Sequence, residues 1–147
     1  MKQNRTWIVV ADGAEARILQ HNVGTAELQQ LPSEEFYDFA APTRDLVSER
    51  LPRVQDSAGP GRHGVEPRSD PHEQQKVGFI TRLIEHLETA AKHHEFERLI
   101  VVAPPRALAV FRKCYSDRLK HLVQHELPHD YTHQTSNYIY QHMRDFI

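Results

Sequence analysis

The sequence predicts an α/β domain of three layers, in which a mixed sheet of about five strands has helices on its faces. Two continuous apolar runs, at residues 6–13 and 98–105, are rich in β-branched side chains and have the length of buried strands. Between them, residues 71–96 carry apolar side chains at helical spacing. A hairpin pairs its strands antiparallel, whereas a helical crossover returns the chain as a parallel strand, so the sheet is expected to be mixed.

The first third of the chain predicts a hairpin followed by a weaker strand. The run TWIVVADG at 6–13 ends in Asp-Gly, which favours a tight turn, and AEARILQHN at 14–22 follows at once. AELQQLPSEEF at 26–36 predicts the third strand. Residues 37–71 predict no regular element, and a stretch of that length inside a compact domain is usually functional or disordered.

The helix at 71–96 has recognisable start signals. Asp70 is the expected N-cap, and Pro71 occupies the first helical position, where its missing N–H costs nothing. One face of this helix is expected to enter the core. The apolar residues of that face are Val77, Ile80, Leu83, Ile84, Leu87 and Ala91.

The last third predicts alternating strands and helices. The buried run at 98–105 ends in two prolines, and Pro105 starts a short helix that continues through 106–115. Ser116 is expected to cap a further helical turn at 116–122.

Residues 121–130 begin as a strand and stop at Pro128, which cannot donate to a sheet. Residues 135–147 predict a final helix, with Ser136 as its N-cap.

Composition restricts the class of protein. A chain of 147 residues fits one domain, and a net charge of −2 gives no global attraction to nucleic acid, so a basic surface would have to be local. Cys114 is the single cysteine, which excludes an internal disulfide and fits a reducing compartment. The apolar run before Asp12 is too short for a signal peptide or a bilayer span. We therefore expect a cytoplasmic protein without a membrane partner.

The segment 54–71, VQDSAGPGRHGVEPRSDP, combines glycines with cations and a histidine. Glycines allow close approach of the backbone, and arginines bind phosphate bidentately. A histidine can act as a general base toward water, here His63 with Asp56 or Glu66. Alternatively, these residues only punctuate and solvate a loop that internal ion pairs hold together. The predicted binding residues are Gly59, Gly61, Arg62, Gly64 and Arg68.

Three stretches together resemble the bacterial host-attachment protein family: WIVVADGAEARIL, DSAGPGRHGVEPRSDPHEQ and RLIVVAPPRALAVFRK. That family in turn is similar to the middle domain of archaeal and eukaryotic peptide-chain release factors. The resemblance implies a single domain of that type over residues 1–147, with ribosomal or transfer RNA as partner and a role in ribosome rescue or dormancy. Release factors carry a Gly-Gly-Gln tripeptide in the corresponding loop, and this chain has Ala58–Gly64 instead, so enzymatic activity stays open.

Two other functions remain open at this point. The first is a small hydrolase that cleaves an ester or phosphate substrate with His63. The second is the role in host-cell attachment that gives the family its title, exerted indirectly, since neither an export signal nor an anchor is recognisable.

Further residues have both a structural and a chemical interpretation. Asp12 follows a buried strand, where catalytic and metal-binding carboxylates often lie, but Asp-Gly is also an ordinary hairpin turn. Arg106 follows another strand and is expected to join the binding residues of the loop. Cys114 is expected in the core. Four histidines recur every four residues, yet Pro128 interrupts any helix there, so we expect neither a metal site nor a cofactor. These histidines are His121, His125, His129 and His133.

Helix and strand edges leave room for a homodimer, although no motif in the sequence requires one.

Overall fold

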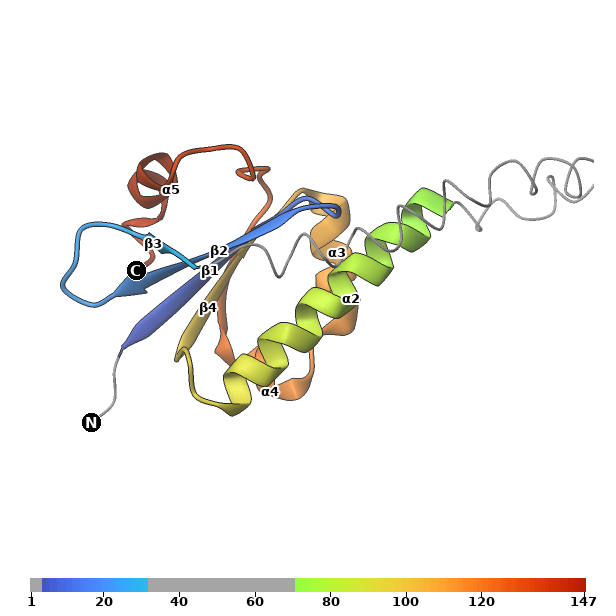
Figure 1. The fold of residues 1–147 in the computed structure, drawn as a ribbon, viewed down its shortest axis with the longest axis horizontal. Helices are drawn as coiled ribbons and strands as arrows, with labels where there is room; N and C mark the ends of the chain where they lie inside the picture. Colours follow the sequence, from blue (N-terminus) through green and yellow to red (C-terminus); the bar gives the residue numbers. More distant parts are fainter. Residues whose placement is uncertain (1–3, 32–70) are drawn as a thin grey trace, which may run out of the picture.

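A mixed five-stranded sheet forms the centre of the molecule, with strand order β3-β2-β1-β4-β5 (Figure 1). The computed structural model describes residues 4–31 and 71–147, the side chains of the second range from residue 74 onward. Helices α2, α3 and α4 lie on one side of the sheet and α5 on the other, which confirms the predicted three-layer α/β architecture.

The strands confirm the predicted hairpin and the mixed sheet. β1 (Arg5–Ala11) pairs antiparallel with β2 (Ala16–Asn22) through the expected hairpin. β4 (Arg98–Val102) lies parallel to β1, and β5 (Val123–Leu127) lies parallel to β4. Within the described residues, the predicted third strand amounts only to β3 (Gln29–Gln30), which pairs with β2.

Alternate residues of the strands face opposite layers, because the side-chain period of a strand is two. Trp7, Val9 and Ala11 of β1 pack toward α2 (Pro71–Lys92), α3 (Pro105–Cys114) and α4 (Asp117–Leu122). Ile8 and Val10 point to the other side and pack under α5 (Ser136–Met143). The helical core residues include Phe79, Ile80, Leu83, Leu87, Leu108, Phe111 and Leu119 on the first side and Ile139 and Met143 on the second.

The long helix differs from its prediction at the C-terminal end and on its buried face. α2 ends at Lys92 rather than at residue 96, and His94 adopts a positive φ of 57° while Glu95 N–H bonds the carbonyl of Ala90. This turn lets Phe96 pack on Trp7, with ring centroids 4.7 Å apart. Val77 is 43% exposed, so its assignment to the apolar face was wrong; the buried face begins at Phe79. Asp70 lies outside the described residues.

The N-cap of α5 is Thr135, one residue before the predicted Ser136. The Thr135 hydroxyl oxygen accepts a hydrogen bond from Tyr138 N–H at 3.0 Å. Thr135→Ala is therefore expected to lower the free energy of unfolding by about 1 kcal/mol, because the first turn of α5 loses its side-chain acceptor. Urea denaturation measures this loss. Ser136→Ala is the matched control, and an equal loss in that variant would contradict the assignment.

Among the described residues, no helix combines the length and apolar character needed to cross a bilayer.

Candidate functional site

Three polar residues that the sequence analysis considered separately, Asp12, Arg106 and His133, lie in segments that follow strands at the carboxyl edge of the sheet. β1, β4 and β5 are parallel, so their carboxyl ends lie at one edge, which is where α/β folds bind ligands. The β1–β2 turn, the start of α3 and the segment 128–135 after β5 all follow these strand ends.

The β1–β2 turn is built around Asp12 and Gly13. Asp12 Oδ1 accepts hydrogen bonds from the backbone N–H groups of Ala14 at 2.8 Å and Glu15 at 2.9 Å. Gly13 has a φ of +109°, and a Cβ there would lie 3.0 Å from Cγ of Lys76 in α2. The expected tight turn is confirmed. It also orients the Asp12 carboxylate, and the second turn of α2 lies beside the hairpin, where Lys76 approaches Gly13 closely.

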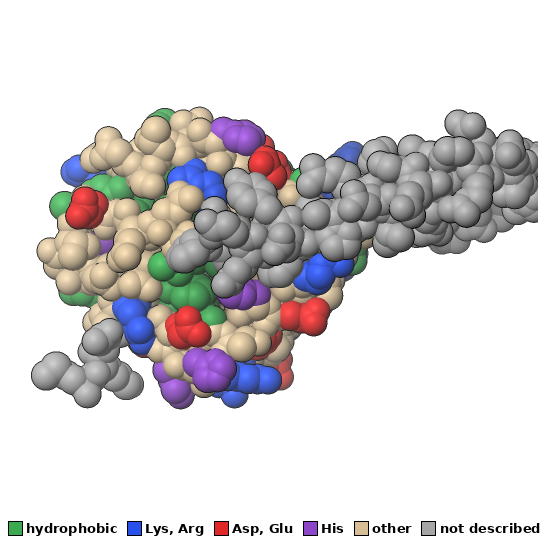
Figure 2. Space-filling view, viewed as in Figure 1, with side chains coloured by type: hydrophobic (Ala, Val, Ile, Leu, Met, Phe, Trp, Pro, Cys, Tyr) green, Lys and Arg blue, Asp and Glu red, His purple; other side chains and the backbone are tan. Residues whose placement is uncertain are grey.

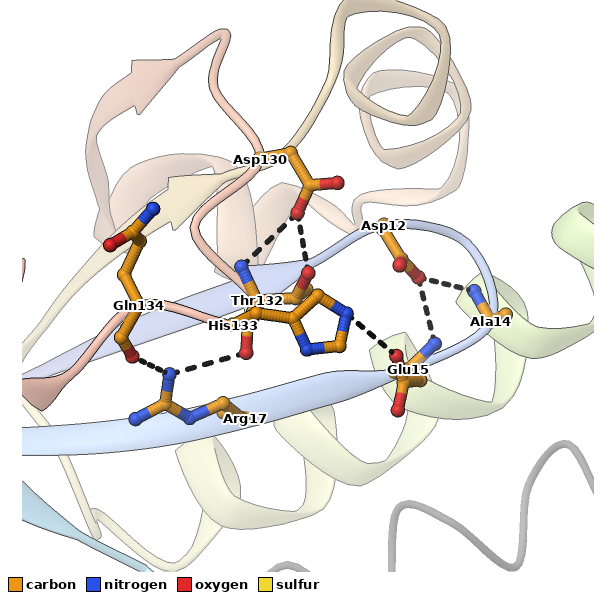
Figure 3. A network of polar contacts seen from close by, with 8 residues as sticks. All are labelled: Asp12, Ala14, Glu15, Arg17, Asp130, Thr132, His133 and Gln134. Atoms are coloured by element: carbon orange, nitrogen blue, oxygen red, sulfur yellow. Dashed lines mark hydrogen bonds and ion pairs between the residues drawn. The ribbon is translucent and has the colours of Figure 1, made fainter.

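Asp12, Glu15 and His133 form a compact group at this edge (Figure 3). His133 Nε2 lies 3.4 Å from Glu15 Oε2, and one potential ligand atom from each residue lies within 4.8 Å of the other two. Two carboxylates and one imidazole are chemically able to hold a divalent cation. The sequence singled out Asp12 and His133 for unrelated reasons and missed Glu15, because their contact depends on how the segment after β5 folds back on the hairpin.

Arg17 ties that segment to the sheet (Figure 3). Its Nη1 donates to the backbone carbonyls of Thr132 and Gln134, on either side of His133, and its Nη2 donates to Gln30 Oε1 at 2.8 Å. The carboxylate of Asp130 accepts from Thr132 N–H at 3.1 Å. Backbone contacts on both sides therefore position His133 against the hairpin.

The other three histidines of the four-residue series lie elsewhere. His121 Nδ1 lies 2.7 Å from the carbonyl oxygen of Asp117 within α4. His125 contacts the ring of Phe146, and His129 stacks on Tyr131 with ring centroids 5.2 Å apart. The period of four did not align these imidazoles, because α4, β5 and the following loop give each of them a different environment. Cys114 is half-buried and packs against the core, close to its prediction.

The two short helices α3 and α4 carry a local excess of basic side chains, and we call their exposed basic residues together the α3–α4 face. Residues 104–122 contain five basic residues and only one acidic residue, although the whole chain has a net charge of −2. All five basic side chains are exposed. By contrast, acidic, basic and histidine side chains are interspersed on the molecular face seen in Figure 2. The basic residues of the α3–α4 face are Arg106, Arg112, Lys113, Arg118 and Lys120.

A hydrogen-bonded carboxylate anchors α3 to β5. Glu126 of β5 accepts from Tyr115 Oη at 2.9 Å and from Arg112 Nε at 2.7 Å. Burial of the phenol is the main cause that raises the pKa of Tyr115 above its ordinary value of 10.0; the charge of Glu126 and the hydrogen bond raise it further. Tyr115 therefore stays protonated in the folded protein at pH values where an unfolded chain ionises it.

This raised pKa predicts a loss of stability in alkali. Below pH 10 the phenol is neutral in both states; above pH 10 the unfolded state releases its proton and the folded state does not, so the free energy of unfolding falls as pH rises. Denaturant titrations at increasing pH above 10 measure this slope. Tyr115→Phe has no phenol to ionise and should give a shallower slope, and an identical slope would contradict the assignment.

The described residues include only one member of the predicted binding set. Arg106 is exposed in the first turn of α3, directly after β4, and so lies at the carboxyl edge. The predicted catalytic residues His63, Asp56 and Glu66 lie outside the described residues. So do the remaining predicted binding residues, which are Gly59, Gly61, Arg62, Gly64 and Arg68.

Residues 7–143 match the model of a protein family described as "Protein required for attachment to host cells". No curated protein matches the chain.

Proposed function

Because the chain belongs to this host-attachment family, we propose that it serves attachment to host cells indirectly, as a cytoplasmic protein that binds ribosomal or transfer RNA. In this proposal the α3–α4 face contacts RNA phosphates. Binding to the ribosome would place the protein in ribosome rescue or dormancy, and the attachment phenotype would follow from altered protein synthesis.

The observation that carries the proposal is the charge of the α3–α4 face. The two helices carry five exposed cations and one carboxylate in a chain with a net charge of −2, and of the five cations Arg112 pairs with Glu126 of β5. Phosphate contacts from Arg and Lys dominate the affinity of proteins for nucleic acid. Leu108 and Phe111 of α3 and Leu119 of α4 are buried in the core, so the cations project from a rigid support.

The same face lacks the apolar anchors that binding to a lipid surface requires. Among the described residues, the exposed large apolar side chains belong to other segments, and none lies on α3 or α4. Phosphates of an RNA backbone therefore fit this surface better than a membrane does. The exposed apolar residues are Val23, Val77, Tyr138 and Phe146.

The predicted loop residues extend this proposal. α2 starts at the carboxyl edge, beside the hairpin turn, and Arg106 lies at the same edge. Arg62 and Arg68 precede α2 in the sequence, and we propose that they add phosphate contacts to those of the α3–α4 face. A catalytic role of His63 as general base depends on RNA binding, because the bound RNA would bring the ester substrate to it. RNA binding is therefore the first property to test.

Co-sedimentation of the purified protein with ribosomes, over a series of salt concentrations, tests the proposal. We expect pelleting at low salt that decreases steeply as salt increases, because phosphate contacts release counterions. The double variant Arg62→Ala, His63→Ala should pellet less if the loop takes part. Absence of pelleting at the lowest salt, together with no binding of free transfer RNA, would contradict the proposed function.

Cell fractionation checks the location. We expect the protein with the ribosomal fraction, and a protein found at the cell surface would favour a direct role in attachment instead.

A further inference from the structure

We infer that Asp12, Glu15 and His133 bind one divalent transition-metal ion of the Zn²⁺ type at the carboxyl edge of the sheet. This inference is independent of RNA binding, because it rests on different side chains from those of the α3–α4 face.

The spacing of the donor atoms fits such an ion. Zinc binds imidazole nitrogen and carboxylate oxygen at about 2.0–2.2 Å, so two ligand atoms of a tetrahedral site lie about 3.3–3.5 Å apart. His133 Nε2 and Glu15 Oε2 are already 3.4 Å apart. The three ligand atoms lie within 4.8 Å of one another, and Asp12 and Glu15 are partly buried while His133 is exposed.

The backbone on both sides of the group limits how far the ligands can move. Asp12 accepts two backbone N–H groups through Oδ1, which orients its carboxylate, as outer hydrogen bonds do for metal ligands in general. Glu15 lies next to the first residue of β2. The carbonyls before and after His133 are bound by Arg17, which fixes the main chain that carries the imidazole.

The stability gained from an ion pair between His133 and Glu15 is too small to explain why these side chains lie together. The side chains of His133 and Glu15 are 78% and 41% exposed, and exposed ion pairs contribute little to stability. The same exposure leaves the remaining coordination positions open to water. Three protein ligands with an open position are the pattern of reactive zinc sites, whereas structural sites are closed by four protein ligands.

The imidazole determines which ions fit. Ca²⁺ and Mg²⁺ prefer sites made only of oxygen atoms, whereas Zn²⁺ accepts imidazole together with carboxylates. We therefore expect Zn²⁺ to bind and Mg²⁺ to bind far more weakly.

Calorimetric titration of the full chain with Zn²⁺ tests the inference. We expect a site with a stoichiometry of one, and a Co²⁺-loaded protein with the visible absorption of a tetrahedral site. His133→Ala and Glu15→Gln should each weaken Zn²⁺ binding by at least about tenfold. His129→Ala removes a histidine from the same loop and is the matched control, since His129 stacks on Tyr131 and is not one of the three proposed ligands.

Three outcomes would overturn the inference: no binding with a stoichiometry of one, equal weakening in His129→Ala, or Mg²⁺ binding as tight as Zn²⁺. Circular dichroism of each variant establishes that it is folded. Glu15→Gln keeps the shape of the side chain, so it tests the site even where His133→Ala disturbs the loop.

Discussion

Replacing Lys113 and Lys120 together with glutamate is expected to weaken binding to transfer RNA by at least about 25-fold at about 0.1 M salt. Both side chains are exposed on the α3–α4 face, at the last turns of α3 and α4. The logarithm of the RNA affinity falls with the logarithm of the salt concentration, by about 0.7 for each phosphate contact. At about 0.1 M salt the loss of two contacts therefore accounts for this factor, even without the repulsion that the glutamates add. Fluorescence anisotropy of labelled RNA measures the affinity.

The matched control is the double variant Lys92→Glu, Arg144→Glu. It changes the net charge by the same amount and also removes cations from helix ends, of α2 and α5. We expect it to bind RNA within a few-fold of the unmodified chain, because neither residue belongs to the α3–α4 face. Equal weakening by the two double variants would mean that binding follows net charge rather than this face.

Phe111→Ala is expected to lower the free energy of unfolding by about 3–5 kcal/mol. Phe111 is fully buried between α3 and the sheet, and its removal leaves a cavity that neighbouring side chains fill only partly. A loss of this size is a large part of the total stability of a small domain. Guanidinium denaturation measures it.

Phe111→Leu is the milder comparison, because leucine fills most of the cavity and should cost clearly less. Loss of Phe111 should also weaken RNA binding through the partial release of α3. A loss below about 1 kcal/mol in Phe111→Ala would contradict its role as the anchor of α3.

The sequence predicted the fold well where one local signal dominated. The runs around Ile8 and Ile100 are short, apolar and rich in β-branched residues, which favours a buried strand, and both residues are buried in the structure. Asp12 before Gly13 predicted the hairpin turn, because the carboxylate satisfies the backbone of the turn itself. Ser116 caps α4 as expected, with its hydroxyl accepting from Leu119 N–H at 3.1 Å.

Other features depended on tertiary contacts that a local pattern does not contain. Val77 has the spacing of a core residue, but it is exposed, and the buried face begins at Phe79. Thr135 and Ser136 are both good caps, and in the structure it is Thr135 that has the extended backbone of an N-cap and accepts from Tyr138 N–H. His133 lies beside Glu15 although 118 positions of sequence separate them, in a segment whose backbone Arg17 binds. No periodicity in the sequence indicates such a contact.

The most direct test of the central claim is to measure how fast individual lysines are acetylated with and without bound transfer RNA. Lys113 and Lys120 belong to the α3–α4 face, whereas Lys92, which is also exposed, is the last residue of α2 and does not belong to it. If the α3–α4 face binds RNA phosphates, RNA protects Lys113 and Lys120 and leaves Lys92 as reactive as before. The claim would be contradicted if RNA protected Lys92 but neither Lys113 nor Lys120, or if bound RNA left the reactivity of all three lysines unchanged.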